Sequence, residues 1–371
     1  MSNVPPLRFP EFSGEWEKIR LGDNCNIKMC KRIMAAQTNT DSGVPFYKIG
    51  TIGGKADAYI SKELFNEYKM KYSFPRKGEV MITCAGTVGN CIIYNGEDSY
   101  YQDSNIVWID NPNEIITNEF LYHLLNKVNW SYLNSTTIVR IYNDDLRNLN
   151  LYTPQHDEQK KISCLLSLID ERIATQNKII EDLKLLKSAI SLNVLHSDTW
   201  EQFKIKDIAK IGRGRVISSI EISQQKNPTY PVYSSQTSNN GIMGYLDDYM
   251  FEGEHISWTT DGANAGTVFY RNGKFNCTNV CGLLKFRKEF DTYFVSLVLA
   301  EATKKYVSIN LANPKLMNNT MGNIQIRLPK LEEQKRISIV FRELQKLWTV
   351  HNSLLTKYTK QKQYLLSQMF I

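Results

Sequence analysis

Two stretches of the chain, residues 154–196 and 329–371, share one pattern of apolar and polar positions. Apolar side chains recur at spacings of three and four, which places them on one face of an α-helix. Each stretch opens with a proline followed by acidic residues and contains no internal glycine or proline, which suits an uninterrupted helix. The pattern predicts two long helices, each of about 37 residues or roughly 55 Å.

The two stretches align without gaps when Pro154 is placed on Pro329, since "PQHDEQKKIS" opens the first and "PKLEEQKRIS" the second. A seam with heptad spacing runs through both, and polar residues interrupt it at shared positions. We therefore interpret the helices as a mutual coiled coil rather than as two separate core helices. The first seam is Leu166, Ile169, Ile173, Gln176, Ile180, Leu183 and Lys187, and the second is Phe341, Leu344, Trp348, His351, Leu355, Tyr358 and Lys362.

The polar seam positions also suggest how the two helices align. In an antiparallel pair centred near positions 181–182, Gln176 lies opposite Lys362 and Lys187 opposite His351. Four polar groups then share two layers of the seam. We predict this antiparallel alignment.

The segments between the helices repeat as well. "GEWEKIRLGDNCNI" (14–27) parallels "DTWEQFKIKDIAKI" (198–211), and "CAGTVGNCIIY" (84–94) parallels "TDGANAGTVFY" (260–270). "TTIVRIYNDDLRNLNLYTP" (136–154) parallels "NLANPKLMNNTMGNIQIRLP" (310–329), which brings Arg140 level with Lys315. Short apolar runs such as "VMITCAG" and "HISWTTDG", divided by turns, predict strands, and residues 118–133 and 291–307 predict matching helices.

The predicted fold class is therefore α+β, with two pseudo-symmetric globular domains separated by two long helices that form an antiparallel coiled coil. We place the domains at 1–153 and 198–328 and the helices at 154–197 and 329–371. The Gly-rich turns around Gly86 and Gly262 are expected to serve backbone geometry, because glycine tolerates positive φ.

Composition adds a mild bias towards nucleic acid, since the 371 residues carry a formal net charge of +7. No apolar run reaches the roughly 18 residues of a membrane span. The N-terminus lacks the apolar segment of a secretory signal, and the seven cysteines show no paired CxxC spacing, so we expect a cytoplasmic protein with reduced thiols. Cys277 and Cys281, with His255 nearby, lack a second ligand pair, and no metal site is expected.

Motifs for catalysis are missing from the sequence. Each Asn-Pro pair, at Asn111, Asn227 and Asn313, lacks the second proline and the aromatic residue of an adenine methylase motif. "GTIGGKAD" (50–57) lacks the spacing of a phosphate-binding loop, and "GRGR" (212–215) is no dinucleotide fingerprint. We therefore expect a chain without catalytic residues.

The doubled layout resembles the specificity (S) subunit of type I restriction-modification enzymes. The resemblance rests on the two segment openings "GEWEKIRLGD" and "DTWEQFKIKD", on "YPVYSSQTSNNGIMGYLDDY" (230–249) and "TDGANAGTVFY", and on the two helix starts. It covers essentially the full length.

The resemblance implies that each globular domain is a target-recognition domain that reads one half of a bipartite, asymmetric site in double-stranded DNA. The helices would set the spacing of the domains and dock two modification (methyltransferase) subunits, which methylate adenine with S-adenosylmethionine. Restriction (translocase and nuclease) subunits that use ATP and magnesium would complete the enzyme, while this chain binds no cofactor. A coiled-coil scaffold that binds proteins, a self-contained methylase or nuclease, and a specificity subunit of another methylation or restriction system remain alternatives.

Base edges and phosphates are contacted by basic and amide side chains, so these residues near turns are the candidate DNA contacts. In the first domain they are Lys28, Lys31, Arg32, Arg76, Lys77 and Arg140, and in the second Arg213, Arg215, Gln236, Asn239, Asn240 and Lys315. Surface positions or turn geometry explain each of them equally simply. At the helix starts, Glu158, Gln159, Glu333 and Gln334 are candidates for partner binding, with helix capping as the other explanation.

Overall fold

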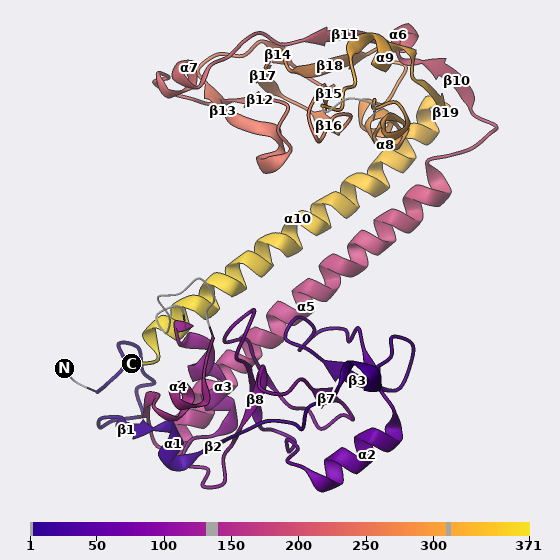
Figure 1. Cartoon of the computed structure of the whole chain (residues 1–371). Coiled ribbons are helices and arrows are strands. Elements are labelled where there is room, and N and C mark those ends of the chain that lie inside the picture. The colour runs from indigo at the N-terminus through magenta and orange to yellow at the C-terminus, as the bar shows by residue number, and fades with distance from the viewer. Residues whose placement is uncertain (1–2, 131–139, 309–312) are drawn as a thin grey trace. The chain divides into compact units, whose positions relative to one another are not determined.

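The computed structural model describes residues 3–130, 140–308 and 313–371 (Figure 1). It forms two compact units, Met1–Asn177 with Ser353–Ile371, and Lys178–Asn352. Each unit holds one globular domain together with turns from both long helices, α5 (His156–Val194) and α10 (Leu331–Gln368). The boundaries of the units therefore fall inside the helices rather than at their ends.

The first globular domain contains three small sheets with the strand orders β2-β8-β5-β6, β4-β3-β7 and β1-β9. Its strands are β1 (Glu17–Arg20), β2 (Asn26–Lys28), β3 (Val44–Tyr47), β4 (Tyr59–Ile60), β5 (Val80–Thr83), β6 (Cys91–Ile93), β7 (Tyr100–Tyr101), β8 (Ile106–Asp110) and β9 (Asn150–Thr153). Its helices are α1 (Leu21–Asn24), α2 (Lys62–Lys71), α3 (Asn118–Lys127) and α4 (Asn143–Arg147), with a 3₁₀ turn at Ala35–Gln37.

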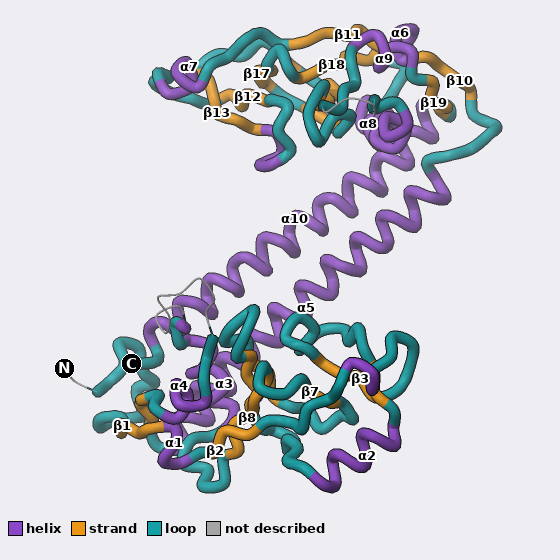
Figure 2. Tube along the Cα trace, in the orientation of Figure 1, coloured by secondary structure: helices purple, strands orange, loops and turns teal. Residues whose placement is uncertain are grey.

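The second globular domain also contains three sheets, with the strand orders β11-β18-β15-β16, β13-β12-β17-β14 and β10-β19. Figure 2 shows the strands of both domains in orange. Its strands are β10 (Glu201–Lys204), β11 (Ala209–Arg213), β12 (Tyr230–Tyr233), β13 (Ile242–Leu246), β14 (Phe251–Glu252), β15 (His255–Thr259), β16 (Val268–Arg271), β17 (Lys274–Cys277), β18 (Cys281–Phe286) and β19 (Gln325–Leu328). Its helices are α6 (Ile205–Ile208), α7 (Ser219–Ser223), α8 (Thr292–Ala302) and α9 (Asn318–Asn323), with 3₁₀ turns at Ser238–Gly241 and Thr303–Lys305.

The sheets of the two domains correspond, except that β14 adds one strand in the second domain. The antiparallel sheet β2-β8-β5-β6 corresponds to β11-β18-β15-β16, and the parallel pair β3–β7 corresponds to β12–β17. In each core a repeated tryptophan packs edge-on against a phenylalanine of a corresponding helix, α3 or α8. Trp16 lies 5.8 Å from Phe120 and Trp200 lies 5.9 Å from Phe294, measured between ring centroids. The predicted α+β class and its duplication are confirmed.

Most of the predicted elements are found. The strands expected from "VMITCAG" and "HISWTTDG" are β5 and β15, which are central in corresponding sheets. The helices α3 and α8 are shorter than expected, since α3 ends at Lys127, and residues 131–133 of the predicted helix lie outside the described part. The Gly-rich turns do have positive φ, at 67° for Gly86 and 91° for Gly262.

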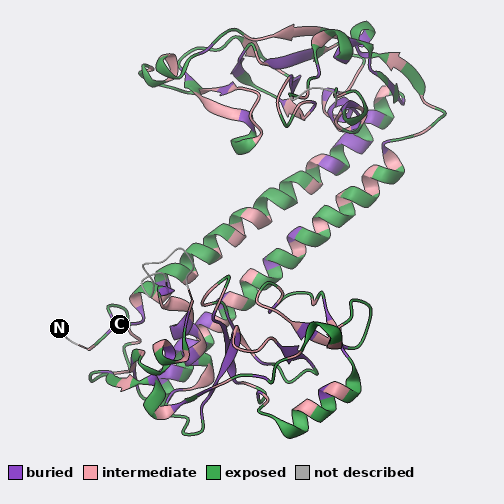
Figure 3. Ribbon diagram, viewed as in Figure 1, coloured by how far each residue is buried: buried purple, intermediate pink, exposed green. Residues whose placement is uncertain are grey.

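The two long helices run antiparallel, as predicted. In the first unit, Leu166 and Ile169 of α5 share a core with Leu365 and Met369 near the end of α10. In the second unit, Leu183 of α5 and Leu344 of α10 line one hollow of about 320 Å³. Apart from Trp348, which is exposed, all predicted seam positions are buried or half-buried. Figure 3 shows buried and intermediate patches along both helices among exposed ones.

The predicted register of the helices is wrong. Lys362 was expected opposite Gln176 but forms an ion pair with Asp170 at 2.6 Å. Lys187 was expected opposite His351 but lies beside Leu344 and Trp348. An apolar seam repeats every few residues and therefore fits several registers. The acid that pairs with Lys362 in the observed register lies outside the predicted seam, next to Ile169.

We expect Asp170→Asn to lower the free energy of unfolding by about 1–2 kcal/mol, because it leaves a largely buried ammonium group without its counter-ion. The side chains of Lys362 and Asp170 are only 18% and 28% exposed. The matched control is Glu343→Gln, which breaks the exposed pair Glu343–Lys346 on α10 and should change stability by less than about 0.5 kcal/mol. Denaturant unfolding of both variants checks this, and equal effects would contradict it.

Candidate nucleic-acid interface

The repeated glutamines fasten the start of each long helix to its globular domain. Gln159 is 1% exposed, and its Oε1 accepts from the backbone N–H of Thr117 at 2.7 Å. Gln334 is equally buried, and its Oε1 accepts from the backbone N–H of Asp291 at 2.9 Å. Thr117 and Asp291 are the N-caps of α3 and α8, so both glutamines hold the same point of the fold.

These contacts overturn most of the expected partner-binding set. Gln159 and Gln334 are buried in internal hydrogen bonds, and Glu158 is 1% exposed and ion-paired with Arg8 at 2.6 Å. Because a protein partner could not reach them, only the exposed Glu333 stays a candidate. The repeated sequence suggested a docking site. Its glutamines instead join each long helix to its globular domain.

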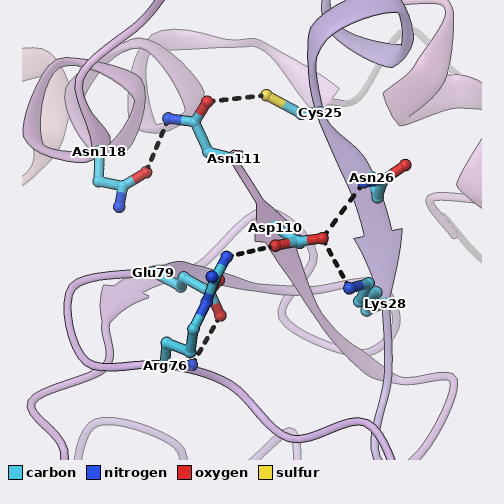
Figure 4. A network of polar contacts seen from close by, with 8 residues as sticks. All are labelled: Cys25, Asn26, Lys28, Arg76, Glu79, Asp110, Asn111 and Asn118. Carbon is cyan, nitrogen blue, oxygen red and sulfur yellow. Dashed lines mark hydrogen bonds and ion pairs between the residues drawn. The ribbon is translucent and has the colours of Figure 1, made fainter. Parts of the chain in front are cut away.

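In the first domain, two candidate DNA contacts meet at one carboxylate. Asp110, at the end of β8, pairs with Lys28 at 2.6 Å and with Arg76 at 2.6 Å (Figure 4). Arg76 also bonds Glu79 at 2.9 Å, so two cations face two carboxylates. Both cations remain accessible, with side chains 42% and 68% exposed, but the acids neutralise them locally.

Hydrogen bonds and neighbouring charges keep Asp110 of this network ionised. Burial raises the pKa of Asp110, but hydrogen bonds from Lys28 and Asn26 and the charges of Lys28 and Arg76 outweigh it and hold the pKa below its ordinary value. Asp110 is therefore ionised at neutral pH. Lys28 and Arg76 are consequently held in fixed positions on the surface.

The remaining first-domain candidates lie apart from this network. Arg32 is 65% exposed and pairs with Asp103 at 2.8 Å, and the ammonium of Lys31 lies 5.3 Å from the ring centroid of Tyr72. Lys77 is exposed, with its aliphatic stem beside Gly96. These side chains are accessible, but no further contact joins them into one site among the described residues.

Arg140 and Lys315 occupy equivalent places, as the sequence alignment predicted. Ile141, which follows Arg140, donates its backbone N–H to the carbonyl of Cys84 in the turn after β5, at 2.9 Å. Leu316, which follows Lys315, donates likewise to the carbonyl of Thr260 in the turn after β15, at 2.8 Å. We call these places the turn edges of the two domains. In the first domain, Met29 and Arg140 line a hollow of about 340 Å³ at this edge.

The second turn edge carries an additional cation. Arg213, at the end of β11, donates to Asn318 Oδ1 at 3.0 Å, and Asn318 follows shortly after Lys315 in the chain. Met29 holds the corresponding place in the first domain, because Ile27 pairs with Ile109 as Ile211 pairs with Leu284. The equivalent edges therefore present different side chains, an apolar one in the first domain and a basic one in the second.

The "GRGR" segment owes its second glycine to close packing. A Cβ atom on Gly214 would lie 1.4 Å from the carbonyl oxygen of Cys277, so only glycine fits where the chain passes β17. Arg215 is 45% exposed and pairs with Glu221. Its charge is therefore neutralised within the domain, like that of Lys28.

The loop before β13 contains the last three candidates. Gln236 is half-buried and donates through Nε2 to the carbonyl of Ile242 at 2.5 Å, so it closes the loop. Asn239 and Asn240 are exposed and have positive φ of 47° and 54°. Beneath them lies Arg271, which the sequence did not single out because a basic residue at a strand end gives no local signal of burial.

The described residues provide neither a membrane-spanning helix nor a cluster of metal ligands. No helix there is both long and apolar enough to cross a membrane. No group of three or more His, Cys, Asp or Glu side chains in residues 3–130, 140–308 and 313–371 could hold a metal ion.

Both halves of the chain resemble one known protein family, and parts of it resemble curated relatives. The family model for the type I restriction modification DNA specificity domain matches residues 13–185 and 197–357. A putative type I restriction enzyme specificity subunit of Haemophilus influenzae is 47% identical over 45% of this chain and 43% of its own length. The specificity subunit of the MpnII enzyme of Mycoplasma pneumoniae is 43% identical over 40% of this chain and 44% of its own. The chain thus aligns with less than half of either relative.

Solved structures share the fold over the full length. The S subunit of a type I restriction-modification system from M. genitalium is 16% identical, with a TM-score of 0.75 over 99% of both chains. A chain from a structure on complex assembly of the type I R-M system has a TM-score of 0.52 over 98% of this chain and 99% of its own, also at 16% identity. Because the family model matches both halves of the sequence, the chain belongs to the type I restriction modification DNA specificity family.

Proposed function

We propose that the chain is the sequence-specificity subunit of a type I restriction-modification complex. Each globular domain would read one half of a bipartite, asymmetric site in double-stranded DNA. The observation that carries the proposal is the tandem match of the specificity family to both halves. Equivalent turn edges with different side chains, such as Met29 and Arg213, fit two half-sites of different sequence.

The proposal gives the chain a binding role and leaves the chemistry to its partners. Two methyltransferase subunits would methylate adenine with S-adenosylmethionine, and restriction subunits would use ATP and magnesium, all in the cytoplasm, where the DNA is. The long helices would provide docking surface, since they expose apolar side chains in the second unit at Leu185, Leu186, Leu347 and Val350. The fold shared with a chain from a type I assembly supports such partners.

The salt dependence of DNA binding tests the proposal. For the complex of this chain with its methyltransferase subunits, we expect the affinity for DNA to fall by about 10³-fold or more between 50 and 200 mM salt if six or more phosphates are contacted. Footprinting should show two protected sequences separated by an unprotected spacer. A complex that binds DNA without sequence preference would support the scaffold alternative instead.

The turn edges supply the matched variants for that experiment. Arg140→Ala and Lys315→Ala should each weaken binding to all sequences and reduce the slope of log affinity against log salt by about 1, as the loss of one phosphate contact does. Lys346→Ala is the control, because Lys346 lies on α10 and is exposed and paired with Glu343. An unchanged slope in both turn-edge variants would remove these residues from the interface.

A further inference from the structure

Arg271 is a buried arginine without an acidic partner in the described structure. It ends β16 and is 2% exposed. Its Nε donates to Ser257 Oγ at 2.9 Å, and its Nη1 donates to the carbonyl of Asn240 at 2.9 Å. The guanidinium lies over the ring of Tyr233, 3.6 Å from the centroid, while Nη2 has no hydrogen-bond partner among the described residues.

The rings of Tyr233 and Phe269, whose centroids lie 3.6 and 4.5 Å from the guanidinium carbon, compensate part of the cost of burying this charge, but they leave Nη2 without an acceptor in the described part of the chain. A buried charge costs free energy unless an opposite charge or a full set of acceptors compensates it, and an apolar side chain of similar volume is often as stable or more stable. Burial accordingly lowers the pKa of Arg271. An unsatisfied buried donor such as Nη2 is an exception that calls for an explanation.

Arg271 supports a short strained loop. Residues 234–241 form a closed turn, since the backbone N–H of Ser234 donates to the carbonyl of Gly241 at 2.9 Å. Asn239 and Asn240 both have positive φ, a conformation that costs free energy for residues other than glycine. The bond from Arg271 to the carbonyl of Asn240 holds the loop at its strained point.

Gly241 closes the same arrangement. Its φ of 81° is left-handed, and a Cβ atom there would lie 2.9 Å from Nη2 of Arg271. The backbone therefore covers the guanidinium closely. The side chains of Ser238, Asn239 and Asn240 are exposed as a result, and the amide of Asn240 makes no hydrogen bond to another described residue.

We propose that Arg271 is a positioning residue that holds a base-reading loop, Ser234–Gly241, with the amide of Asn240 directed at a base edge in the half-site of the second domain. An asparagine amide matches the paired donor and acceptor of adenine in the major groove, so adenine is the base that it would select. The inference rests on the proposed function and adds a residue, a loop and a base to it.

The test uses the complex of this chain with its methyltransferase subunits and a DNA library randomised in both half-sites. We expect Asn240→Ala to reduce the preference for adenine about tenfold at one base pair of the second half-site, because one amide contact to the base is lost. Arg271→Met should reduce preference at several base pairs of that half-site, because the whole loop loosens, and Arg271→Lys should keep part of it. Preference in the first half-site should not change.

Controls separate positioning from folding. Asn272→Ala changes an exposed asparagine next to Arg271 but outside the loop, and it should leave both half-sites unchanged. Thermal unfolding of each variant shows whether it folds, and if Arg271→Met does not, Arg271→Lys and Asn240→Ala decide the outcome. Unchanged preference in the second half-site in those two variants would overturn the inference. A wild-type complex without any sequence preference would instead refute the proposed function itself.

Discussion

Replacing Gln159 with alanine is expected to lower the free energy of unfolding of the first compact unit by about 3–5 kcal/mol, since each buried group left unsatisfied costs about 1–3 kcal/mol. The amide of Gln159 bonds the backbone N–H of Thr117 and donates to Ile115, Thr153 and Pro154, the last three at 2.9 Å. Alanine leaves these groups buried, and water cannot replace the lost bonds without opening the junction of helix and domain. Denaturant unfolding measures this loss of free energy, with an m-value equal to that of the wild type showing that stability alone has changed.

The neighbouring residue provides a matched control. Lys160 is the next residue of α5 and is exposed, so Lys160→Ala should change stability by less than about 0.5 kcal/mol. Gln334→Ala should destabilise the second unit less than Gln159→Ala destabilises the first. The reason is that Gln334 makes only two hydrogen bonds of this kind among the described residues, to Asp291 and to Pro329. If Gln159→Ala and Lys160→Ala have equal free energies of unfolding, Gln159 does not fasten the helix to its domain.

The first unit should also lose stability as the pH falls from 6.5 towards 4, by up to about 3 kcal/mol from one histidine. His123 on α3 is 1% exposed, and its Nδ1 has no partner among the described residues. Burial, followed by the charge of Lys362, lowers its pKa to about 4, although the charge of Asp170 and the backbone of Ser163 oppose the shift.

The sign follows from proton uptake. Between pH 6.5 and 4 the unfolded chain protonates His123 while the folded chain does not, so a lower pH favours the unfolded state. Unfolding free energies at pH 7 and pH 4.5 should differ less in His123→Asn than in the wild type. The exposed His196 supplies the control, since His196→Asn should keep the wild-type pH dependence. Equal pH dependence in all three proteins would contradict the burial of a neutral His123.

The sequence was most informative where a physical requirement repeats. The alignment of Pro154 with Pro329 located both helices, and the equivalence of Arg140 and Lys315 holds in the backbone hydrogen bonds of the two domains. Periodicity did not determine the register of α5 and α10, because every apolar layer of the seam offers a similar partner. The ion pair of Asp170 with Lys362 distinguishes the observed register from the predicted one.

Candidate DNA contacts were harder to predict, because a basic residue does not reveal its partner in the sequence. Lys28 and Arg76 share Asp110, which is distant from both of them along the chain. Gln159 and Gln334 looked like surface groups because polar residues near a helix start usually are exposed. Arg271 escaped notice for the opposite reason, since burial of a charge is decided by the tertiary fold alone.

The ion pair between Lys362 and Asp170 makes the two halves of the chain unequal. In the alignment that places Pro154 on Pro329, Lys362 corresponds to Lys187 and Asp170 to Gln345, and both of these line one hollow in the second unit. A chain assembled from two first halves would carry this ion pair twice, whereas one built from two second halves would carry two lysines and no acid. The residue at this one position, an acid in the first half and an amide in the second, therefore decides whether a chain of two identical halves has acids to pair with its lysines.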